Sequence, residues 1–327
     1  MTPLRIGLIG AGKHGSRYAK HIVEDVPQAR LVALCRRQRQ EGQRLAAAYH
    51  CAYYTDFRDL INDPHLDAIV VAVPPAFHGA IVAAACQAKK HLLIEKPFAI
   101  SVGEACRMRD MIADSCVRCM VAHTLRFNTV VQTIKARAQE IAPLHSIYLS
   151  QRFEPSPLMW LDHKAESGGG IVLHTGVHSF DLLRFLTGCE VTQVWSQTSQ
   201  IVTQETEDNF VMTCNLNDPL LKGVVFGSRS TASRSGLIEL SGEKGQLVGD
   251  HTHGFVHLLR GLDRKELPVA LATPTVRETV KAFVEGLQQH TPFPITVEDG
   301  IHAVAIAEAC YHSAANGGQA AAVEHHI

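Results

Sequence analysis

Two basic side chains beside rigid or glycine-rich turns are the first candidates for chemistry in this sequence. Lys96 follows an apolar run that ends at Ile94, and it precedes Pro97, which restricts the backbone. His178 follows Gly168-Gly169-Gly170 and begins a helix-like stretch. A lysine ammonium can stabilise a developing alkoxide, and a histidine can transfer a proton near neutral pH. A surface Lys–Glu pair and a buried structural histidine are the competing interpretations.

A glycine pattern near the N-terminus predicts a dinucleotide site. Gly10-Ala11-Gly12-Lys13-His14-Gly15 matches G-x-G-x-x-G and stands between a predicted strand and a predicted helix. Gly10 would permit the tight turn, Gly12 the approach of a pyrophosphate, and Gly15 close packing of helix on strand. Free N–H groups at the helix start would bind the phosphates. An ordinary glycine-rich turn is the alternative.

The residues after the second predicted strand bear on which dinucleotide binds. Folds that prefer NAD commonly place Asp or Glu about 20 residues past the glycines, where it holds the ribose hydroxyls. Here Arg36 and Arg37 occupy that position. A guanidinium group suits a 2′-phosphate, so we expect NADP to be preferred, with NAD possible. Two exposed arginines that start a helix are the alternative.

The predicted elements divide the chain near residue 122. Apolar strand-like runs alternate with helices up to that point, which is typical of a parallel sheet with helices on both faces. Longer alternating stretches follow and indicate a mixed or antiparallel sheet. We expect an α/β protein with a Rossmann domain at 1–122 and an α+β domain at 123–327. Strands are predicted at 6–9, 31–34, 68–73, 92–94, 117–122, 146–152, 191–201, 210–216, 221–228 and 237–240, and helices at 13–24, 38–49, 76–88, 102–113, 129–140, 178–186, 276–289 and 298–315.

Composition argues for a globular protein without a strongly charged partner. The net charge is −1, and 46% of the residues are hydrophobic. Nothing favours nucleic acid or a membrane as partner, no apolar run is long enough to cross a bilayer, and we expect a cytoplasmic location. The nine cysteines are dispersed and predict free thiols. The lone pair Cys116 and Cys119 only weakly suggests a redox or zinc role, and small residues near a strand explain it equally.

Several further motifs follow the glycine loop in a fixed order along essentially the whole chain. They are Val71–Pro75 with His78, Ile94-Glu95-Lys96-Pro97, Arg126-Phe127-Asn128, the triple glycine with Gly176, His178 and Asp181, Gly242-Glu243-Lys244-Gly245 and Glu298-Asp299-Gly300. Each motif is modest, but their order is specific, and together they resemble those of the glucose–fructose oxidoreductase / inositol 2-dehydrogenase / MocA (GFO/IDH/MocA) family of oxidoreductases.

The resemblance implies a Rossmann domain followed by an open-faced, mostly antiparallel sheet domain that binds substrate. It also implies an active site between the two domains, and homodimers or homotetramers formed through the open sheet face. Lys96, His178 and His174 would be catalytic. Cofactor contacts would come from residues 10–15, Arg36, Arg37, Val73, Pro74, His78, Glu95 and Lys96, and substrate contacts from Arg126 and His174. Trp160 and Asp162 precede the triple glycine in a loop-like stretch and could also line the substrate pocket, although packing explains Trp160 equally well.

Two positions depart from the family pattern. His174 stands where the family's dehydrogenases usually carry Asp, four residues before the histidine, so it could bind substrate or share a proton with His178. The spacing of His174 and His178 would also allow zinc, but only Asp181 offers a third ligand, and we expect no metal. Lys89 stands where the family commonly has glycine at positive φ, which would cost about 1 kcal/mol.

These observations predict a nicotinamide-dependent oxidoreductase, with NADP(H) preferred, that acts on a sugar, cyclitol or related small hydroxy or keto compound. The alternatives are a dehydrogenase of a dihydrodiol or of an amino-acid-related keto compound, and a cofactor-binding regulatory or sensor protein without turnover. A sugar-transforming enzyme that keeps its cofactor bound throughout the cycle is a further alternative.

Overall fold

The chain folds into two compact units, each built from two separate stretches of sequence. A computed structural model describes residues 2–324. The first unit comprises Met1–Thr124 and Pro274–Ile301, and the second comprises Leu125–Thr273 and His302–Ile327. The chain first passes from one unit to the other after Thr124, close to the boundary expected near residue 122. The expected domain limits differ from the structure in the later segment, because residues 274–301 return to the first unit.

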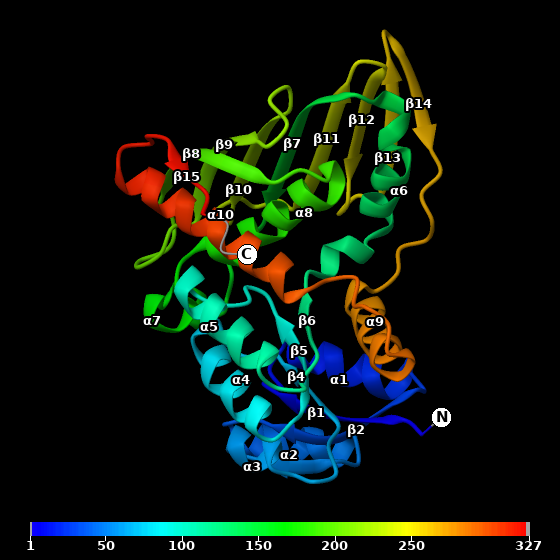
Figure 1. The fold of residues 1–327 in the computed structure, drawn as a ribbon, viewed down its shortest axis with the longest axis vertical. Coiled ribbons are helices and arrows are strands. Elements are labelled where there is room, and N and C mark those ends of the chain that lie inside the picture. Colours follow the sequence, from blue (N-terminus) through cyan, green and yellow to red (C-terminus); the bar gives the residue numbers. More distant parts are fainter. Residues whose placement is uncertain (1, 325–327) are drawn as a thin grey trace. The chain divides into compact units, whose positions relative to one another are not determined.

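The first unit is a Rossmann fold, as the sequence predicts. Six parallel strands lie in the order β3-β2-β1-β4-β5-β6, and helices flank the sheet (Figure 1). The strands are β1 (Leu4–Ile9), β2 (Ala29–Cys35), β3 (Ala52–Tyr54), β4 (Ala68–Val71), β5 (His91–Glu95) and β6 (Cys119–Ala122), and the helices are α1 (Gly15–Glu24), α2 (Arg39–Ala48), α3 (Phe57–Ile61), α4 (His78–Gln87), α5 (Val102–Ala113) and α9 (Thr275–Gln289).

The strand register gathers the predicted cofactor residues at one edge of this sheet. Ile9 pairs with Cys35 on one side and with Val71 on the other, and Val71 pairs with Ile94. The strands therefore end level with one another, so the segments that follow β1, β2, β4 and β5 meet at their carboxyl ends. These segments carry the glycine loop, the two arginines, Val73-Pro74 and Lys96.

Helix α9 explains why a late segment belongs to the first unit. It is amphipathic, and its buried face includes Val280, Phe283 and Val284, all fully inaccessible to solvent. This helix packs against α1. The sequence pattern predicts the helix but not its partner, because an apolar face shows only that something must cover it.

The second unit is built on a nine-stranded, mostly antiparallel sheet. The strand order is β14-β13-β12-β11-β7-β10-β9-β8-β15, and within residues 2–324 only β7 and β10 are parallel neighbours in this sheet. The strands are β7 (Leu144–Arg152), β8 (Val191–Ser199), β9 (Asn209–Leu216), β10 (Lys222–Ser228), β11 (Ser235–Gly242), β12 (Gly245–Asp250), β13 (Phe255–Arg260), β14 (Asp263–Leu267) and β15 (Ala321–Ala322).

Helices cover one face of this sheet and leave the other face accessible. Helices α6 (Thr129–Arg137) and α8 (Val177–Thr187) lie over one face in Figure 1, and both contact sheet strands. The short α7 (Lys164–Ser167) precedes α8, and α10 (Val297–Ala315) contributes its later part to this unit. Along β9, buried Met212 and Cys214 alternate with exposed Val211 and Thr213. The expected open-faced sheet is therefore present.

The sequence did not predict every element. Strand β12 contains Gly245 and Gly249, and the first four residues of β14 are charged and exposed, so neither shows the apolar alternation of a half-buried strand. Both are held by pairing with their neighbours. No described helix is long and apolar enough to span a membrane.

Candidate functional site

The glycine loop has the geometry that a dinucleotide requires. Gly10 has a φ of +96°, and a Cβ there would lie 2.3 Å from the carbonyl oxygen of Ala72. A Cβ on Gly15 would lie 2.0 Å from the carbonyl oxygen of Gly10, whereas one on Gly12 would meet nothing within 4 Å. Two glycines are therefore needed by the fold itself, and the third leaves open space beside the loop. That space fits a pyrophosphate next to the start of α1.

Arg36 lies directly beside this loop. Its Nη1 donates a hydrogen bond to the carbonyl oxygen of Ala11 at 2.7 Å, and its Nη2 donates to Oε1 of Gln38 at 2.9 Å. The neighbouring Arg37 guanidinium lies over the ring of Phe77, 5.5 Å from its centroid. Arg36 thus sits at the edge of the loop, where the sequence predicts contacts to the adenosine ribose, and Arg37 lies against Phe77 in the segment that follows β4.

A buried carboxylate connects the glycine loop to the end of β5. Glu95 is 6% exposed and accepts hydrogen bonds from Nε2 of His14 at 2.6 Å, from the Tyr18 hydroxyl, and from the Lys96 main-chain N–H at 3.1 Å. Burial alone would raise the pKa of Glu95. The positive charge and hydrogen bond of His14, the charge of Lys96 and the Tyr18 hydroxyl outweigh burial and lower that pKa to about 2. Glu95 therefore fixes both the loop and the backbone of Lys96.

His78 links the segments that follow β4 and β5. Its Nδ1 lies 3.0 Å from the carbonyl oxygen of Phe98, and its Nε2 lies 3.2 Å from that of Val73. The side chain is buried, which lowers the pKa of the imidazole. The structure thus gives His78 main-chain partners that hold Val73 and Phe98, while Pro74 and Lys96 remain partly exposed at the same edge.

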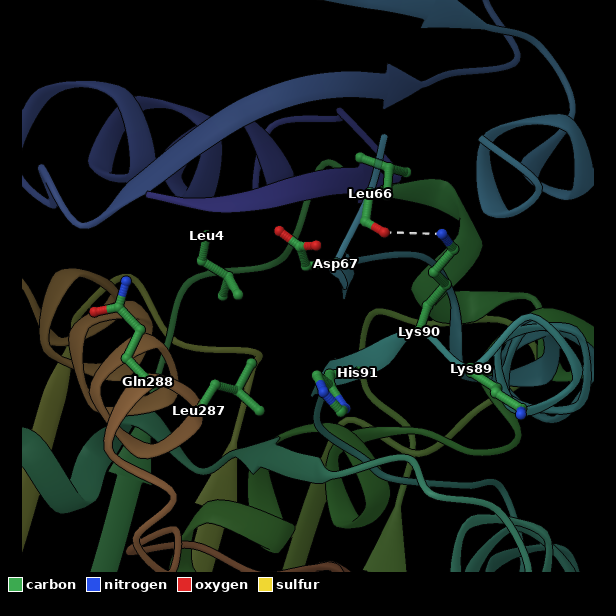
Figure 2. Close-up of a pocket in the computed structure, with 8 residues that line it drawn as sticks. All are labelled: Leu4, Leu66, Asp67, Lys89, Lys90, His91, Leu287 and Gln288. Atoms are coloured by element: carbon green, nitrogen blue, oxygen red, sulfur yellow. Dashed lines mark hydrogen bonds between the residues drawn. The ribbon is translucent and has the colours of Figure 1, made fainter. Parts of the chain in front are cut away.

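A cavity of about 350 Å³ opens at the opposite edge of the sheet, away from these residues (Figure 2). It is lined by the strand starts at Leu4 and His91, and by Lys90, whose Nζ donates to the carbonyl oxygens of Asp63 and Leu66. Lys89 has a φ of +55°, so the expected positive-φ turn is confirmed. The cavity contains none of the predicted site residues.

In the second unit, both candidate histidines lie on one helical segment. The turn Val172–Gly176 is a π-helix that runs directly into α8, and His178 is the second residue of α8. His174 is 4% exposed and its Nε2 lies 3.0 Å from the carbonyl oxygen of Ser167, so that nitrogen carries the proton. The Trp160 ring meets His174 edge-on, at 5.3 Å between centroids.

A carboxylate that the sequence analysis missed holds the start of this segment. Glu207 accepts hydrogen bonds from the main-chain N–H groups of Gly170 at 3.0 Å and Val172 at 3.0 Å, and from the Tyr311 hydroxyl at 2.8 Å. Its main-chain oxygen accepts from the N–H of Ile171 at 2.9 Å. Burial raises the pKa of Glu207. In the sequence, Glu207 and Asp208 are simply two acidic residues ahead of the strand predicted at 210–216. That pattern is not specific enough to indicate a role for Glu207.

Comparison with known proteins agrees with both halves of the fold. The family description "Oxidoreductase family, NAD-binding Rossmann fold" matches residues 4–123, and "GFO/IDH/MocA C-terminal domain" matches residues 137–248. The chain belongs to the GFO/IDH/MocA family. It is therefore an NAD(P)-dependent oxidoreductase, as the sequence predicts.

Relatives of this family member match it over nearly their full lengths. Myo-inositol 2-dehydrogenase of Thermotoga maritima is 26% identical, covering 91% of this chain and 92% of the relative. Scyllo-inositol 2-dehydrogenase (NADP(+)) of Bacillus subtilis is 19% identical, covering 95% and 93%. The solved levoglucosan dehydrogenase in complex with NADH and levoglucosan has a TM-score of 0.89 at 21% identity, covering 98% and 100%. This last likeness concerns the fold.

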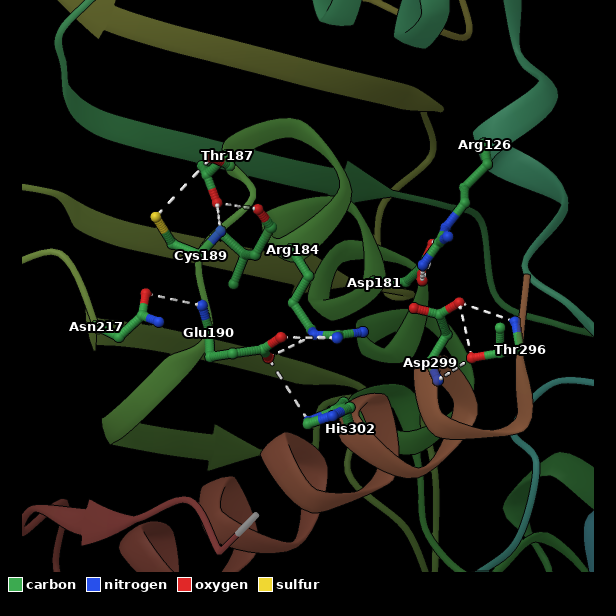
Figure 3. A network of polar contacts seen from close by, with 11 residues as sticks. Arg126, Asp181, Arg184, Thr187, Cys189, Glu190, Asn217, Thr296, Asp299 and His302 are labelled. Carbon is green, nitrogen blue, oxygen red and sulfur yellow. Dashed lines mark hydrogen bonds and ion pairs between the residues drawn. The ribbon is translucent and has the colours of Figure 1, made fainter. Parts of the chain in front are cut away.

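Two residues expected to bind substrate have structural partners in this GFO/IDH/MocA protein. The Arg126 guanidinium forms a two-pronged ion pair with Asp181, with Nε and Nη2 at 2.5 to 3.1 Å from the carboxylate oxygens (Figure 3). Both side chains are buried, and Arg126 also lies over the Phe185 ring. Asp162 accepts hydrogen bonds from the main-chain N–H groups of residues 204–206. Both residues thus organise the polypeptide around the histidine segment.

The alternatives raised for metal and thiol chemistry gain no support from the geometry. Asp181 is committed to Arg126 rather than placed as a ligand beside the two histidines. Within residues 2–324, no group of three His, Cys, Asp or Glu side chains could hold a metal ion. All nine cysteines are free thiols; Cys116 is exposed, and Cys119 is buried, which raises the pKa of its thiol.

Proposed function

We propose that this GFO/IDH/MocA protein transfers hydride between NADP(H) and a CH–OH or carbonyl carbon of a sugar, cyclitol or related small compound. Inositol and levoglucosan dehydrogenases among the relatives support a polyhydroxylated substrate. The observation that carries the proposal is the glycine loop, with free space beside Gly12 and the Arg36 guanidinium at its edge. Because no carboxylate occupies the ribose position, NADP(H) is preferred over NAD(H).

The proposed catalytic groups are Lys96 and His178. The bound nicotinamide supplies or accepts the hydride. The Lys96 ammonium donates a hydrogen bond to the reacting oxygen and stabilises its alkoxide character, while Glu95 holds the Lys96 backbone. The His178 imidazole accepts the hydroxyl proton during oxidation and returns it during reduction. This division of roles leaves His78 to hold the segment around Val73.

Substrate contacts are proposed for Trp160 and His174. Their edge-on contact joins a large apolar surface to an imidazole whose Nε2–H is fixed by Ser167. An imidazole in place of the family's usual carboxylate removes a permanent negative charge from this position. Arg126 and Asp162 support the substrate site indirectly, through the contacts they make within the second unit.

The quaternary proposal follows the family resemblance, and the cellular proposal follows from the lack of an apolar run long enough to cross a bilayer. The face of the sheet that carries Val211 and Thr213 is exposed, and a second subunit would cover it in a homodimer or homotetramer. We place the protein in the cytoplasm.

A Gly12→Val variant provides a direct test of the cofactor half of the proposal. The new side chain meets no protein atom near its Cβ, so thermal stability should stay unchanged. It would occupy the space proposed for the pyrophosphate, so NADPH binding, followed by fluorescence titration, should fall at least about tenfold. Unchanged NADPH affinity in a folded Gly12→Val protein contradicts the proposed cofactor site.

A turnover panel tests the substrate half. Inositols, aldoses, ketoses and anhydrosugars would be assayed with NADP+ and NAD+, and with NADPH and NADH in the reverse direction, while dihydrodiols and amino-acid-related keto compounds serve as comparison classes. We expect turnover with a polyol or sugar. Tight NADPH binding without turnover of any compound would favour a sensor, and cofactor that co-purifies and stays bound during turnover would favour the sugar-transforming alternative.

A further inference from the structure

Glu207 is a buried carboxylate with several donors that no residue role assigned above includes. Three consecutive main-chain N–H groups, those of residues 170–172, bond to Glu207 through its carboxylate or its main-chain oxygen. A helix leaves its first N–H groups without partners inside the helix. Glu207 therefore supplies those partners from a different part of the chain, the segment just before β9.

The local packing is shaped around this carboxylate. A Cβ on Gly170 would lie 2.0 Å from the Glu207 main-chain oxygen, and one on Gly169 would lie 2.1 Å from the Tyr311 hydroxyl. The triple glycine thus permits the approach of Glu207 and Tyr311 to the start of the histidine segment. A second anchor lies further along, where Nη2 of Arg229 donates to Oγ1 of Thr175 at 3.1 Å.

We propose that Glu207 is the positioning residue for the histidine segment: its carboxylate fixes the turn that carries His174 and leads into His178. The catalytic meaning of this inference rests on the proposed function, because His178 is the proposed acid–base group. Glu207 acts through the main chain and does not touch the substrate.

The carboxylate also changes the electrostatics of the two imidazoles. The start of a helix carries a partial positive charge that disfavours a protonated histidine close by, and an ionised carboxylate at that end offsets it. All three partners of the Glu207 side chain are donors, which matches the ionised form. The Arg229 guanidinium also interacts electrostatically with Glu207, and so does the buried Cys310 thiol. Neutralising Glu207 should therefore lower the pKa of His174 and His178.

The test compares Glu207→Gln with a matched control, Asp218→Asn. Asp218 also accepts a main-chain N–H, that of Leu220, but it does so at the turn beyond the other end of β9. Ring-proton NMR titrations would follow His174 and His178, assigned from the spectra of His174→Gln and His178→Gln. In Glu207→Gln we expect His178 to titrate roughly 0.2–0.7 pH units lower than in the wild type. Asp218→Asn should leave the titration unchanged.

Kinetics provide the second measurement. We expect Glu207→Gln to lower kcat at least about tenfold, by displacing the acid–base group, and to leave the affinity for NADPH unchanged. The acidic limb of the kcat/KM profile should move down in pH with the histidine titration. A folded Glu207→Gln protein with wild-type titration and wild-type kcat overturns the inference.

Two further variants keep the test decisive. If Glu207→Gln does not fold, Glu207→Asp keeps the charge but shortens the reach, and it should lower kcat while His178 titrates as in the wild type. Tyr311→Phe keeps both main-chain bonds and should retain most of kcat; a loss as large as that of Glu207→Gln would contradict the main-chain role. Because the NMR titration needs no substrate, absence of turnover in the wild type would refute the proposed function while leaving Glu207 testable.

Discussion

Nη1 of Arg36 donates a hydrogen bond to the carbonyl oxygen of Ala11, 2.7 Å away, so a guanidinium group lies against the loop proposed to bind the dinucleotide. Residues 36–40, directly after β2, include no acidic side chain to bind the ribose hydroxyls. The same guanidinium could turn to a 2′-phosphate, which would be a stronger acceptor than a neutral carbonyl oxygen.

The first prediction concerns cofactor choice. The wild type should bind NADPH more tightly than NADH, and Arg36→Asp should weaken NADPH binding by about 1–3 kcal/mol through loss of a charged hydrogen bond. Isothermal titration with both nucleotides measures this. Arg30→Asp, at the amino end of β2, is the control and should bind NADPH as the wild type does. Equal affinity of the wild type for NADPH and NADH would contradict the prediction.

The second prediction concerns the reacting groups. Lys96→Met should lower kcat by roughly 10²–10³, since it removes the donor to the alkoxide, and His178→Ala by roughly 10²–10⁴, since it removes the acid–base group. Both variants should bind NADPH with the affinity of the wild type. Lys265→Met, on the exposed strand β14, is the control for loss of a lysine. Steady-state kinetics with the best substrate of the panel would show the effect, and wild-type turnover by either variant would place the chemistry elsewhere.

The third prediction follows from the pKa of Glu95, which is lowered from 4.5 to about 2 in the folded protein. A carboxylate with a lowered folded-state pKa stabilises the fold above its unfolded-state pKa and loses that contribution as the pH falls through the folded-state value. The free energy of unfolding should therefore decline between about pH 4.5 and pH 2, by up to about 3 kcal/mol from this group. Glu95→Gln should show a shallower decline in urea titrations over that range. If the free energy of unfolding fell with pH equally in the wild type and in Glu95→Gln, Glu95 would not contribute to the pH dependence of stability.

The fourth prediction concerns the turn that leads into β5. Lys89 has a φ of +55°, so Lys89→Gly should raise the free energy of unfolding by about 1 kcal/mol. Gln87→Gly, at the end of α4, is the control and should lower that free energy by a similar amount, because glycine is a poor helix former. Thermal unfolding would distinguish the two. A Lys89→Gly protein with a lower free energy of unfolding than the wild type would contradict the prediction. It would mean that contacts of the lysine side chain stabilise the fold by more than the positive φ destabilises it.

The sequence predicted the parts of the fold whose signals are local. The glycine loop shows its role because Gly10, Gly12 and Gly15 stand at fixed spacing between a strand and a helix. The positive φ of Lys89 followed from the family's usual glycine and is confirmed. Nearly all of the strands and helices with a clear apolar period are also present in the structure.

Contacts between distant segments could not be predicted in the same way. Glu207 meets Gly170 across 37 residues, and no periodicity in either segment indicates the other. The family resemblance places Arg126 among the substrate contacts, and the structure pairs it with Asp181, which lies 55 residues away in the sequence. Only the fold shows that this charge is already neutralised.

The return of α9 to the first unit has a consequence for how the protein is made. Residues 125–273 emerge from the ribosome between the two stretches that build the Rossmann fold, which takes roughly 7–30 seconds at ordinary rates of synthesis. During that interval α1 lacks the apolar cover that α9 provides. A nascent chain, or a fragment cut after residue 124, therefore exposes a hydrophobic surface on its nucleotide-binding half, and chaperones recognise such a surface until translation has passed residue 289.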